Sequence, residues 1–500
     1  MLAAHPLDAM TTPLRFLKGT QSIVLNNVPP SRTLLEVLRE DMGCTAAKEG
    51  CNEGDCGACV VVVAEAVAGK LAYKAVNSCI RLAHSVQGMA LWTAEDIDSK
   101  DNTAHPAQQA LLECHGSQCG FCTPGFVMSL FGMYQQHTSK GHAITREQAQ
   151  QELAGNLCRC TGYRPILDAA QKMGGLPLVQ VDEAGTLQLL EQLAPDKHGL
   201  KPDSMDKSSY QSPQTLAALL DLKTKHPGAQ LVAGTTDVGL WVTKQHRQFD
   251  HIIDLTRVAE LRRIENYPHH IAIGAAVTLT DAFDALVKDR PALAHFTARF
   301  AGLSVRNSGT LGGNIAGGSP IGDSMPLLIA LGANVVLMSA QGHREIPLEQ
   351  LYTGYKQNVM APPEVLARIK VPRPTAAEFS RIYKISKRFD DDISAVCLAL
   401  NLQLDGGLVV GLRIGVGGVA ATPVRAITTE AACAQKAWAK ATIDQAKKVI
   451  STEFLPLSDM RASSAYRTQL LVNLLERFWL ESQGMQHINL ESFNLSEAAC

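Results

Sequence analysis

Apolar and polar positions divide the first part of this chain into short strands and one helix. Residues 14–25 alternate in the way that predicts a β-hairpin, and the apolar run Val60–Val63 predicts a strand. Between them, Ser31 is predicted to cap a helix that ends at Gly43. The pattern therefore predicts a small sheet accompanied by a helix.

Helical patterns dominate the next segment. Thr123 and Pro124 fit the N-cap and the first position of one helix. A second helix is expected from Thr145 to Gly155, and a third opens at Pro165. These elements predict a small helical domain.

A stretch without clear periodicity follows. Residues 176–208 are predicted to form a linker, because prolines, aspartates and serines interrupt the pattern there. After it, residues 216–226 predict a helix and residues 230–233 predict a strand. The chain is therefore expected to change domain across this stretch.

The last part of the chain combines strands and helices again. Residues 398–404 and 408–416 alternate like paired strands around Asp405-Gly406-Gly407, a strong hairpin signal. Helices are expected through residues 443–450 and 466–480. This pattern predicts a small α+β domain.

Eight of the 13 cysteines fall into two sets with the spacing of metal ligands. The first set, Cys51-x4-Cys56-x2-Cys59 followed by Cys79, has the plant-type spacing for a [2Fe-2S] cluster. Glycines between these cysteines let the backbone curl around a compact inorganic group. A zinc knuckle would favour CxxC pairs, and a disulfide framework belongs to short secreted chains. The spacing therefore favours an iron–sulfur cluster.

The second set is Cys119-x2-Cys122 with Cys158-x-Cys160. Two ligands one residue apart can hold one cluster only from an irregular turn, whereas two ordinary CxxC pairs would suit zinc better. We therefore predict a second [2Fe-2S] cluster. The remaining cysteines show no ligand spacing and are expected to be buried apolar residues or idle thiols; they are Cys44, Cys114, Cys397, Cys433 and Cys500.

Two turns rich in Gly and Thr follow apolar segments, at residues 234–239 and 307–315. Such turns present clustered N–H and hydroxyl donors, which are the groups that a pyrophosphate needs. Neither turn matches GxGxxG, so a Rossmann domain is not supported. Because most Gly-rich turns have no ligand, the two turns alone leave phosphate binding open.

Composition narrows the possible functions. A chain of 500 residues with 46% hydrophobic residues can bury a large core and form roughly three or four domains. Its formal charge of −2 predicts no general affinity for nucleic acid or anionic lipid. The N-terminus lacks a signal-peptide pattern, and no apolar run reaches membrane-spanning length. With many unpaired thiols as well, we expect a cytoplasmic protein without membrane segments.

Six segments together resemble the iron–sulfur and flavin subunits of the molybdenum hydroxylase family, bacterial xanthine dehydrogenases among them. They are Gly-Cys-Asn-Glu-Gly-Asp-Cys-Gly-Ala-Cys at 50–59, Gln-Cys-Gly-Phe-Cys-Thr-Pro-Gly at 118–125, Cys-Arg-Cys-Thr-Gly-Tyr-Arg at 158–164, Leu-Val-Ala-Gly-Thr-Thr-Asp at 231–237, Leu-Gly-Gly-Asn-Ile at 311–315 and Asp-Asp-Asp-Ile at 390–393. The resemblance covers nearly the whole chain. It implies a multidomain α+β fold with a β-grasp ferredoxin-like domain (12–95), a helical [2Fe-2S] domain (96–175), the linker (176–208), a non-Rossmann FAD-binding domain (209–380) and a C-terminal α+β domain (381–490).

The resemblance also assigns cofactor-binding residues. It implies that FAD phosphates lie against Leu231, Val232, Ala233, Gly234, Thr235, Thr236, Asp237, Val238, Thr310, Gly313 and Asn314. It places Phe300, Asp323, Leu366 and Lys384 against other parts of FAD, although pattern alone would make Phe300 and Leu366 core residues. A possible NAD site would use Asp237, Tyr355 and Asp391. Gln118 matches a glutamine that bonds molybdopterin on a neighbouring chain; without the family it would be a surface amide.

The activity implied by the resemblance is that of the electron-transfer subunit of a xanthine dehydrogenase. The chain is short for the molybdenum-binding domains of eukaryotic relatives, so we expect these on a partner subunit, with two copies of each chain in a heterotetramer. Electrons from hypoxanthine or xanthine oxidation would pass through the two clusters to FAD and then to NAD. Two alternatives remain: the equivalent subunit of an aldehyde or N-heterocycle hydroxylase, and a non-enzymatic electron carrier. No catalytic acid or base is identifiable in the chain.

Overall fold

The computed structural model describes residues 13–98, 103–193 and 209–485. These residues form two compact units, each described by itself. The first unit runs up to residue 260 and also includes residues 278–280 and 301–310; the second comprises 261–277, 281–300 and the chain from 311 on. Parts of the predicted linker, the ends of the outer predicted domains and Cys500 lie outside the described residues.

The first unit begins with a five-stranded sheet of order β2-β1-β5-β3-β4. Its strands are β1 (Leu14–Lys18), β2 (Gln21–Leu25), β3 (Val60–Val67), β4 (Lys70–Asn77) and β5 (Ala90–Trp92). The pair β1–β5 is parallel, and all other pairs are antiparallel. The hairpin predicted over residues 14–25 is confirmed as β1 and β2, with Gly19 in the turn at φ 58°.

The helix predicted in this region exists, but its cap differs from the prediction. The helix α1 (Leu34–Glu36) continues into a π-helical turn, η1 (Val37–Asp41). Its N-cap is Thr33, whose hydroxyl accepts from Glu36 N while the Glu36 carboxylate accepts from Thr33 N. The prediction of Ser31 was wrong because a glutamate lies three residues after Thr33, which completes a capping box. The Ser31 hydroxyl instead accepts from Phe249 N.

Four helices follow the sheet: α2 (Pro106–Glu113), α3 (Thr123–Gln136), α4 (Arg146–Leu153) and α5 (Arg164–Lys172). The predicted cap Thr145 is confirmed for α4. For α3 the prediction was wrong by one residue, because Cys122 is the N-cap and Thr123 already lies in the helix. The Thr123 hydroxyl bonds to the Ser117 hydroxyl instead, at 2.7 Å.

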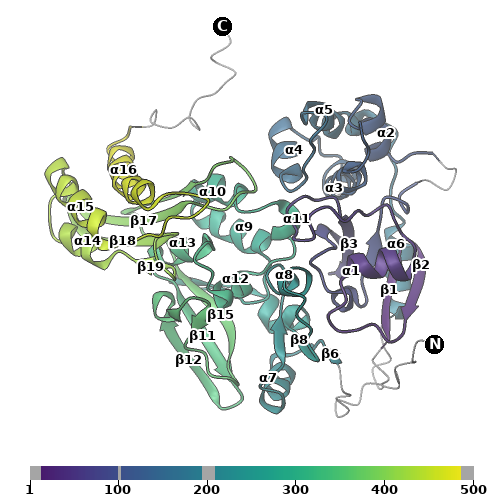
Figure 1. Ribbon diagram of the computed structural model, residues 1–500, viewed down its shortest axis with the longest axis horizontal. Helices are drawn as coiled ribbons and strands as arrows, with labels where there is room; N and C mark the ends of the chain where they lie inside the picture. The colour runs from purple at the N-terminus through teal and green to yellow at the C-terminus, as the bar shows by residue number, and fades with distance from the viewer. Residues whose placement is uncertain (1–12, 99–102, 194–208, 486–500) are drawn as a thin grey trace, which may run out of the picture. The chain divides into compact units, whose positions relative to one another are not determined.

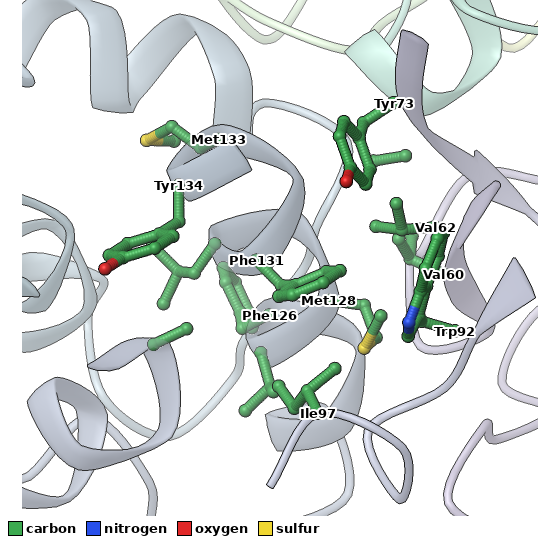
Figure 2. Packing of buried hydrophobic residues seen from close by; sticks show 14 of the residues in the cluster. Val60, Val62, Tyr73, Trp92, Ile97, Phe126, Met128, Phe131, Met133 and Tyr134 are labelled. Atoms are coloured by element: carbon green, nitrogen blue, oxygen red, sulfur yellow. The ribbon is translucent and has the colours of Figure 1, made fainter. Parts of the chain in front are cut away.

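The helix α3 is almost wholly buried and joins the sheet and the helices into one core. Phe126, Phe131 and Tyr134 are at most 1% exposed. Figure 2 shows these side chains in one cluster with Val60, Val62 and Trp92 from the sheet. A helix that is apolar all round must be covered on every side, so α3 fixes the four-helix region against β3.

The segment predicted as a linker contains a helix, α6 (Glu183–Leu193). Thr186, Leu190 and Leu193 are its buried residues, and the two leucines belong to the same core as α3. Their spacing of four and three residues is helical. The prediction overlooked this period because prolines and polar residues flank it on both sides.

The first unit ends with a small parallel sheet of order β6-β8-β7. Its strands are β6 (Ser209–Gln211), β7 (Gln230–Val232) and β8 (His251–Asp254), with helices α7 (Leu216–Lys225) and α8 (Val238–Thr243). The short helix α11 (Leu303–Arg306) also belongs to this unit. The predicted helix 216–226 and strand 230–233 are therefore confirmed to within one residue.

The second unit contains a five-stranded antiparallel sheet of order β12-β11-β15-β10-β9. The strands are β9 (Ile264–Asn266), β10 (His270–Gly274), β11 (Asn334–Ser339), β12 (Gly342–Pro347) and β15 (Val365–Pro372). Near them lie α9 (Leu279–Asp289), α10 (Ala294–Ala298), α12 (Leu311–Gly317), α13 (Ser324–Ala330) and the hairpin of β13 (Tyr352–Gly354) and β14 (Gln357–Asn358).

The second sheet of this unit is the predicted C-terminal α+β layer. The strands β16 (Glu378–Ile385), β17 (Val396–Asp405), β18 (Leu408–Gly417) and β19 (Val424–Arg425) form an antiparallel sheet. The helices α14 (Ile427–Cys433), α15 (Lys440–Glu453) and α16 (Ser464–Ser482) follow, and Figure 1 shows them beside this sheet. The predicted hairpin and the last two predicted helices are confirmed, as is the multidomain α+β class. Across the described ranges, none of the helices has the length and apolarity needed to span a membrane.

Candidate cofactor sites

The first cysteine set converges in the first unit. Cys51, Cys56 and Cys59 lie on the loop between η1 and β3, and Cys79 lies two residues after the end of β4. The Cys51 thiol contacts those of Cys56 and Cys79, and Cys59 also contacts Cys79. The N–H groups of Glu53 and Cys56 each donate to Cys51 Sγ at 3.4 Å. The loop therefore gathers four sulfurs and supplies N–H donors to one of them.

The surroundings of Cys51 and Cys59 favour the ionised forms of these two thiols, whereas the same contacts and burial raise the pKa of Cys56 and of Cys79. Contacts with the thiols of Cys56 and Cys79 are the largest cause that lowers the pKa of Cys51, and backbone N–H donors act in the same direction. The contact with Cys79 lowers the pKa of Cys59 in spite of its burial, and the Asn77 side chain also donates to it. Iron binds cysteine as thiolate, so this chemistry fits a cluster.

The second cysteine set converges at the start of α3 and before α5. The Cys122 thiol contacts Cys158, and Cys160 contacts Cys119. The backbone N–H groups of Cys160 and Thr161 donate to Cys158 Sγ at 3.4 Å. Burial acts to raise the pKa of Cys158, but these bonds and the Thr161 hydroxyl outweigh it and lower the pKa. Burial raises the pKa of Cys122 to about 12.

The two cysteine loops contact one another directly. Leu157 N donates to Cys56 O at 3.0 Å, and the Asn156 side chain donates to Gly57 O at 3.2 Å. A Cβ on Gly125 would lie 2.2 Å from Gly57 O. The loop of the first set therefore rests on the start of α3 and on the segment that leads into Cys158.

The described residues, 13–98, 103–193 and 209–485, contain no group of three His, Cys, Asp or Glu side chains that could hold a single metal ion. A [2Fe-2S] cluster is different, because four cysteines share its two irons. The contacting thiol pairs within each set suit such a shared arrangement, so the donor chemistry at both places fits a [2Fe-2S] cluster.

The two Gly/Thr-rich turns approach one another within the first unit. A Cβ on Gly234 would lie 1.8 Å from Ser308 O, and one on Gly309 would lie 3.2 Å from Thr236 Oγ1. Thr235 has a φ of 58° and a buried hydroxyl with no hydrogen-bond partner among the described residues. The close approach of the two backbone turns and the buried Thr235 hydroxyl without a partner in the described part of the chain suit the binding of a group with acceptor oxygens, such as a phosphate.

The second turn is shorter than the sequence indicated. Residues 311–315 are helical and belong to α12, so only residues 307–310 form a turn. The predicted phosphate residues Thr310 and Asn314 therefore differ in setting: Thr310 is buried in the first unit, whereas Asn314 lies on α12 in the second unit. Gly313 also lies on α12. The glycines were misleading because small residues allow this helix to pack closely; a Cβ on Gly312 would lie 2.4 Å from the Ala275 Cβ.

The second unit contains a buried polar cluster at two other predicted residues. Lys384 Nζ donates to Asp323 Oδ2 at 2.7 Å, and the hydroxyl of Ser394 donates to the same oxygen at 2.8 Å. The two charged side chains are only 4% and 5% exposed. Sequence reasoning missed Ser394, which has no signal of its own. Asn314 Oδ1 accepts from the Ser324 hydroxyl at 2.6 Å.

Other predicted residues have plainer settings. Phe300 is buried and packs edge-on against Phe283 at 5.0 Å, and Leu366 is buried in β15. Gln118 is exposed beside the exposed Cys119. In the possible NAD site, Asp237 is the exposed N-cap of α8 in the first unit. Tyr355 is 60% exposed in the second unit, where Asp391 has a φ of 47°.

The sites define an iron–sulfur flavoprotein, and four family models match the chain in succession. They are the 2Fe-2S iron-sulfur cluster binding domain (residues 18–83), the [2Fe-2S] binding domain (93–171), the FAD binding domain in molybdopterin dehydrogenase (205–374) and the CO dehydrogenase flavoprotein C-terminal domain (381–482). The chain therefore carries two [2Fe-2S] domains and an FAD-binding domain.

Curated relatives extend the likeness over nearly all of the chain. Xanthine dehydrogenase of Drosophila pseudoobscura pseudoobscura is 32% identical over 94% of this chain and 39% of its own length. Aldehyde oxidase 1 of Bos taurus is 29% identical over 95% of this chain and 40% of its own length. The chain thus spans about two fifths of the length of these relatives. With the four domain matches, these relatives show that the chain belongs to the molybdenum hydroxylase family.

Two solved structures resemble about half of the chain. One is a chain of a carbon monoxide dehydrogenase from Hydrogenophaga pseudoflava, 29% identical with a TM-score of 0.52, covering 54% of this chain and 96% of that chain. The other is a chain of quinoline 2-oxidoreductase from Pseudomonas putida 86, 26% identical with a TM-score of 0.51, covering 56% and 99%. In both proteins, the matched portion accounts for nearly a whole separate chain.

Proposed function

We propose that this protein is the electron-transfer subunit of a xanthine dehydrogenase. The observation that carries the proposal is the direct contact of two four-cysteine loops, through Leu157 N and Cys56 O, in a chain that also contains an FAD-binding domain. Electron transfer between clusters requires that their ligands lie close together. The hydrogen bonds from Leu157 N to Cys56 O and from the Asn156 side chain to Gly57 O support the proposal, because they bring the two loops together.

In this proposal, each protein group has a specific task. The two cysteine sets bind the clusters as thiolates, and the N–H donors to Cys51 and Cys158 stabilise sulfur charge. Residues 231–238 and Thr310 with Gly313 and Asn314 bind FAD phosphates, while Phe300, Asp323, Leu366 and Lys384 line the rest of the cofactor. Bound FAD would supply the chemistry that converts two single-electron transfers into the transfer of one hydride.

The overall reaction would be xanthine, water and NAD⁺ giving urate, NADH and a proton. A partner subunit would hold molybdopterin, oxidise the purine and contact Gln118 beside the second cluster. The separate chains matched in carbon monoxide dehydrogenase and quinoline 2-oxidoreductase support a division of this kind. NAD would bind near Asp237, Tyr355 and Asp391, and two copies of each subunit would form the enzyme.

The test is to purify the chain with its native partner, add xanthine without oxygen and follow the visible absorption of the flavin and clusters. We expect bleaching that NAD reverses. If dithionite bleaches the protein and xanthine does not, the assignment of the cofactors is supported and the assignment of xanthine as substrate is wrong. A protein without flavin or iron–sulfur absorption would overturn the proposal altogether.

An aldehyde is the second candidate substrate. The likeness to aldehyde oxidase 1 of Bos taurus, at 29% identity, is close to the likeness to the xanthine dehydrogenases. Bleaching by an aromatic aldehyde but not by xanthine would favour this candidate. Neither substrate would bleach a non-enzymatic electron carrier.

A further inference from the structure

The helix α8 connects the first Gly/Thr-rich turn to the loop of the first cysteine set. It begins at Val238, at the end of that turn, and ends at Thr243. At its end, the Thr243 hydroxyl donates to Asn52 O at 2.8 Å, and Lys244 Nζ donates to Cys51 O at 2.5 Å. This six-residue helix therefore has the proposed FAD-phosphate segment at one end and a cluster ligand at the other.

The other side of the cysteine site has a second connection to the same turns. Arg81 lies two residues after Cys79, and its guanidinium donates to the Ser308 hydroxyl at 3.4 Å. Ser308 is the residue whose carbonyl contacts Gly234. Arg81 therefore reaches from the segment of the fourth cysteine to the point where the two turns meet.

Apolar packing fills the space between these polar connections. Leu82, fully buried, belongs to one cluster with Val232 of β7 and Val242 of α8. A Cβ on Gly239 would lie 2.2 Å from Ile80 O, so α8 has no room to move toward the segment of Cys79. Packed contacts of this kind allow few intermediate positions, and all of these residues belong to the first unit.

We propose that Arg81 and Lys244 are positioning residues that couple cluster binding to FAD binding. A filled cluster fixes the Cys51 and Cys79 segments, and through Lys244 and Arg81 it fixes the two turns that bind FAD phosphate. By thermodynamic reciprocity, bound FAD then stabilises the first cluster by the same factor. The second cluster has neither connection, so bound FAD stabilises it less than the first cluster. This inference rests on the proposed cofactor sites.

The test uses the full chain, with FAD removed by chaotropic salt and then restored. The loss of each cluster to an iron chelator is followed by its own electron paramagnetic resonance signal. In the wild-type protein, we expect FAD to slow the loss of the first cluster on the order of tenfold and to slow the loss of the second cluster much less. In Lys244→Met and Arg81→Met, this protection should fall below roughly twofold, since each variant removes a connection.

Two controls separate coupling from general damage. Lys436 also has an exposed side chain that donates to a backbone carbonyl, Ala432 O, at 2.7 Å. Lys436 lies in the second unit, whereas both proposed connections lie in the first. Lys436→Met should therefore keep the wild-type protection. If Arg81→Met fails to fold, Arg81→Lys keeps one positive donor and should give intermediate protection.

Three results would overturn the inference: no protection by FAD in the wild type, equal protection of both clusters, or full protection in Lys244→Met. A protein that binds no FAD or forms no cluster would instead overturn the proposed function. The two failures are therefore distinguishable.

Discussion

The two cysteine sites use the same ligand and differ in how the protein encloses them. In the first set, Cys59 and Cys79 are buried, and the loop is covered by α8. In the second set, Cys119 and Cys160 are exposed, and only Cys158 is buried. The first site therefore faces inward, toward the proposed flavin segments of the same unit, whereas one side of the second is exposed.

This difference follows from how each loop is built. The first loop contains glycines at positive φ and is packed against other backbone; a Cβ on Gly57 would lie 2.3 Å from Gly155 O. The second site is made from two helix beginnings, those of α3 and α5, and Tyr163 before α5 has a φ of 69°. A loop enclosed by backbone can be buried, while a site between helix ends keeps an open face.

The largest expected effect comes from removing one ligand of each set. Cys51→Ser should abolish the first cluster's paramagnetic signal and Cys119→Ser the second's, each with a loss of about half of the bound iron. Iron analysis and low-temperature electron paramagnetic resonance would measure this. Cys433→Ser is the control, because Cys433 is a buried packing residue of the second unit. Loss of both signals in either ligand variant would mean that the sites are not independent.

The stability of the helical domain should also be more sensitive to acid than that of the ferredoxin-like domain, because of His105. This N-cap residue of α2 is 1% exposed, and its Nδ1 accepts from Ala107 N, which requires a neutral ring. Burial lowers its pKa from 6.5 to about 4. As pH falls, the unfolded chain binds the proton first, so the stability is complete above pH 6.5 and decreases between 6.5 and about 4.

The loss of unfolding free energy should reach about 3 kcal/mol at the acid end of this window. Urea unfolding at several pH values would measure it. His105→Asn retains a capping group and should flatten the curve between pH 6.5 and about 4. An unchanged curve in this variant would show that another group causes the acid sensitivity.

The packing between the two cysteine loops can be tested with two glycines of the same helix. In α3, a Cβ on Gly125 would lie 2.2 Å from Gly57 O, whereas one on Gly132 would have no neighbour closer than 3.4 Å. We expect Gly125→Ala to destabilise the protein by about 1–3 kcal/mol through overpacking. Gly132→Ala should be neutral or stabilising by about 0.5–1 kcal/mol, since alanine favours the helix. Equal effects in urea unfolding would contradict this difference.

The smallest expected effect concerns the capping box on the ferredoxin side. Thr33→Ala removes the hydroxyl that accepts from Glu36 N and should cost about 1 kcal/mol. Ser31→Ala is the comparison, because the Ser31 hydroxyl caps no helix and bonds Phe249 N instead. If Ser31→Ala unfolded α1 and Thr33→Ala did not, the assignment of the cap would be wrong. Circular dichroism during urea unfolding is the measurement.

Local features with strong geometry could be predicted from the sequence. The hairpin at Gly406 and Gly407, the capped helix at Thr145 and the two cysteine spacings each depend on a few neighbouring residues. What the sequence did not indicate depends on distant contacts. Lys244 and Arg81 look like ordinary surface cations until the fold brings them to Cys51 O and Ser308. Ser394, in the segment between β16 and β17, meets Lys384 at the distant Asp323.

The pattern was also ambiguous where glycines serve packing. Residues 311–315 suggested a phosphate turn, yet they form a helix. The glycine at position 312 allows this helix to pack closely against Ala275. The same residue type at Gly234 does lie in a turn against Ser308. Sequence alone cannot distinguish a glycine that forms a turn from one that allows close helix packing, since both positions require a residue without a side chain.

The central claim is that this chain holds two unlike [2Fe-2S] clusters beside a flavin. The most direct measurement is low-temperature electron paramagnetic resonance of the dithionite-reduced full chain, combined with its iron and flavin content. The account predicts two distinct paramagnetic signals, one lost in Cys51→Ser and the other in Cys119→Ser, with bound FAD. A single signal, a signal from one isolated iron, or zinc in place of iron would contradict it.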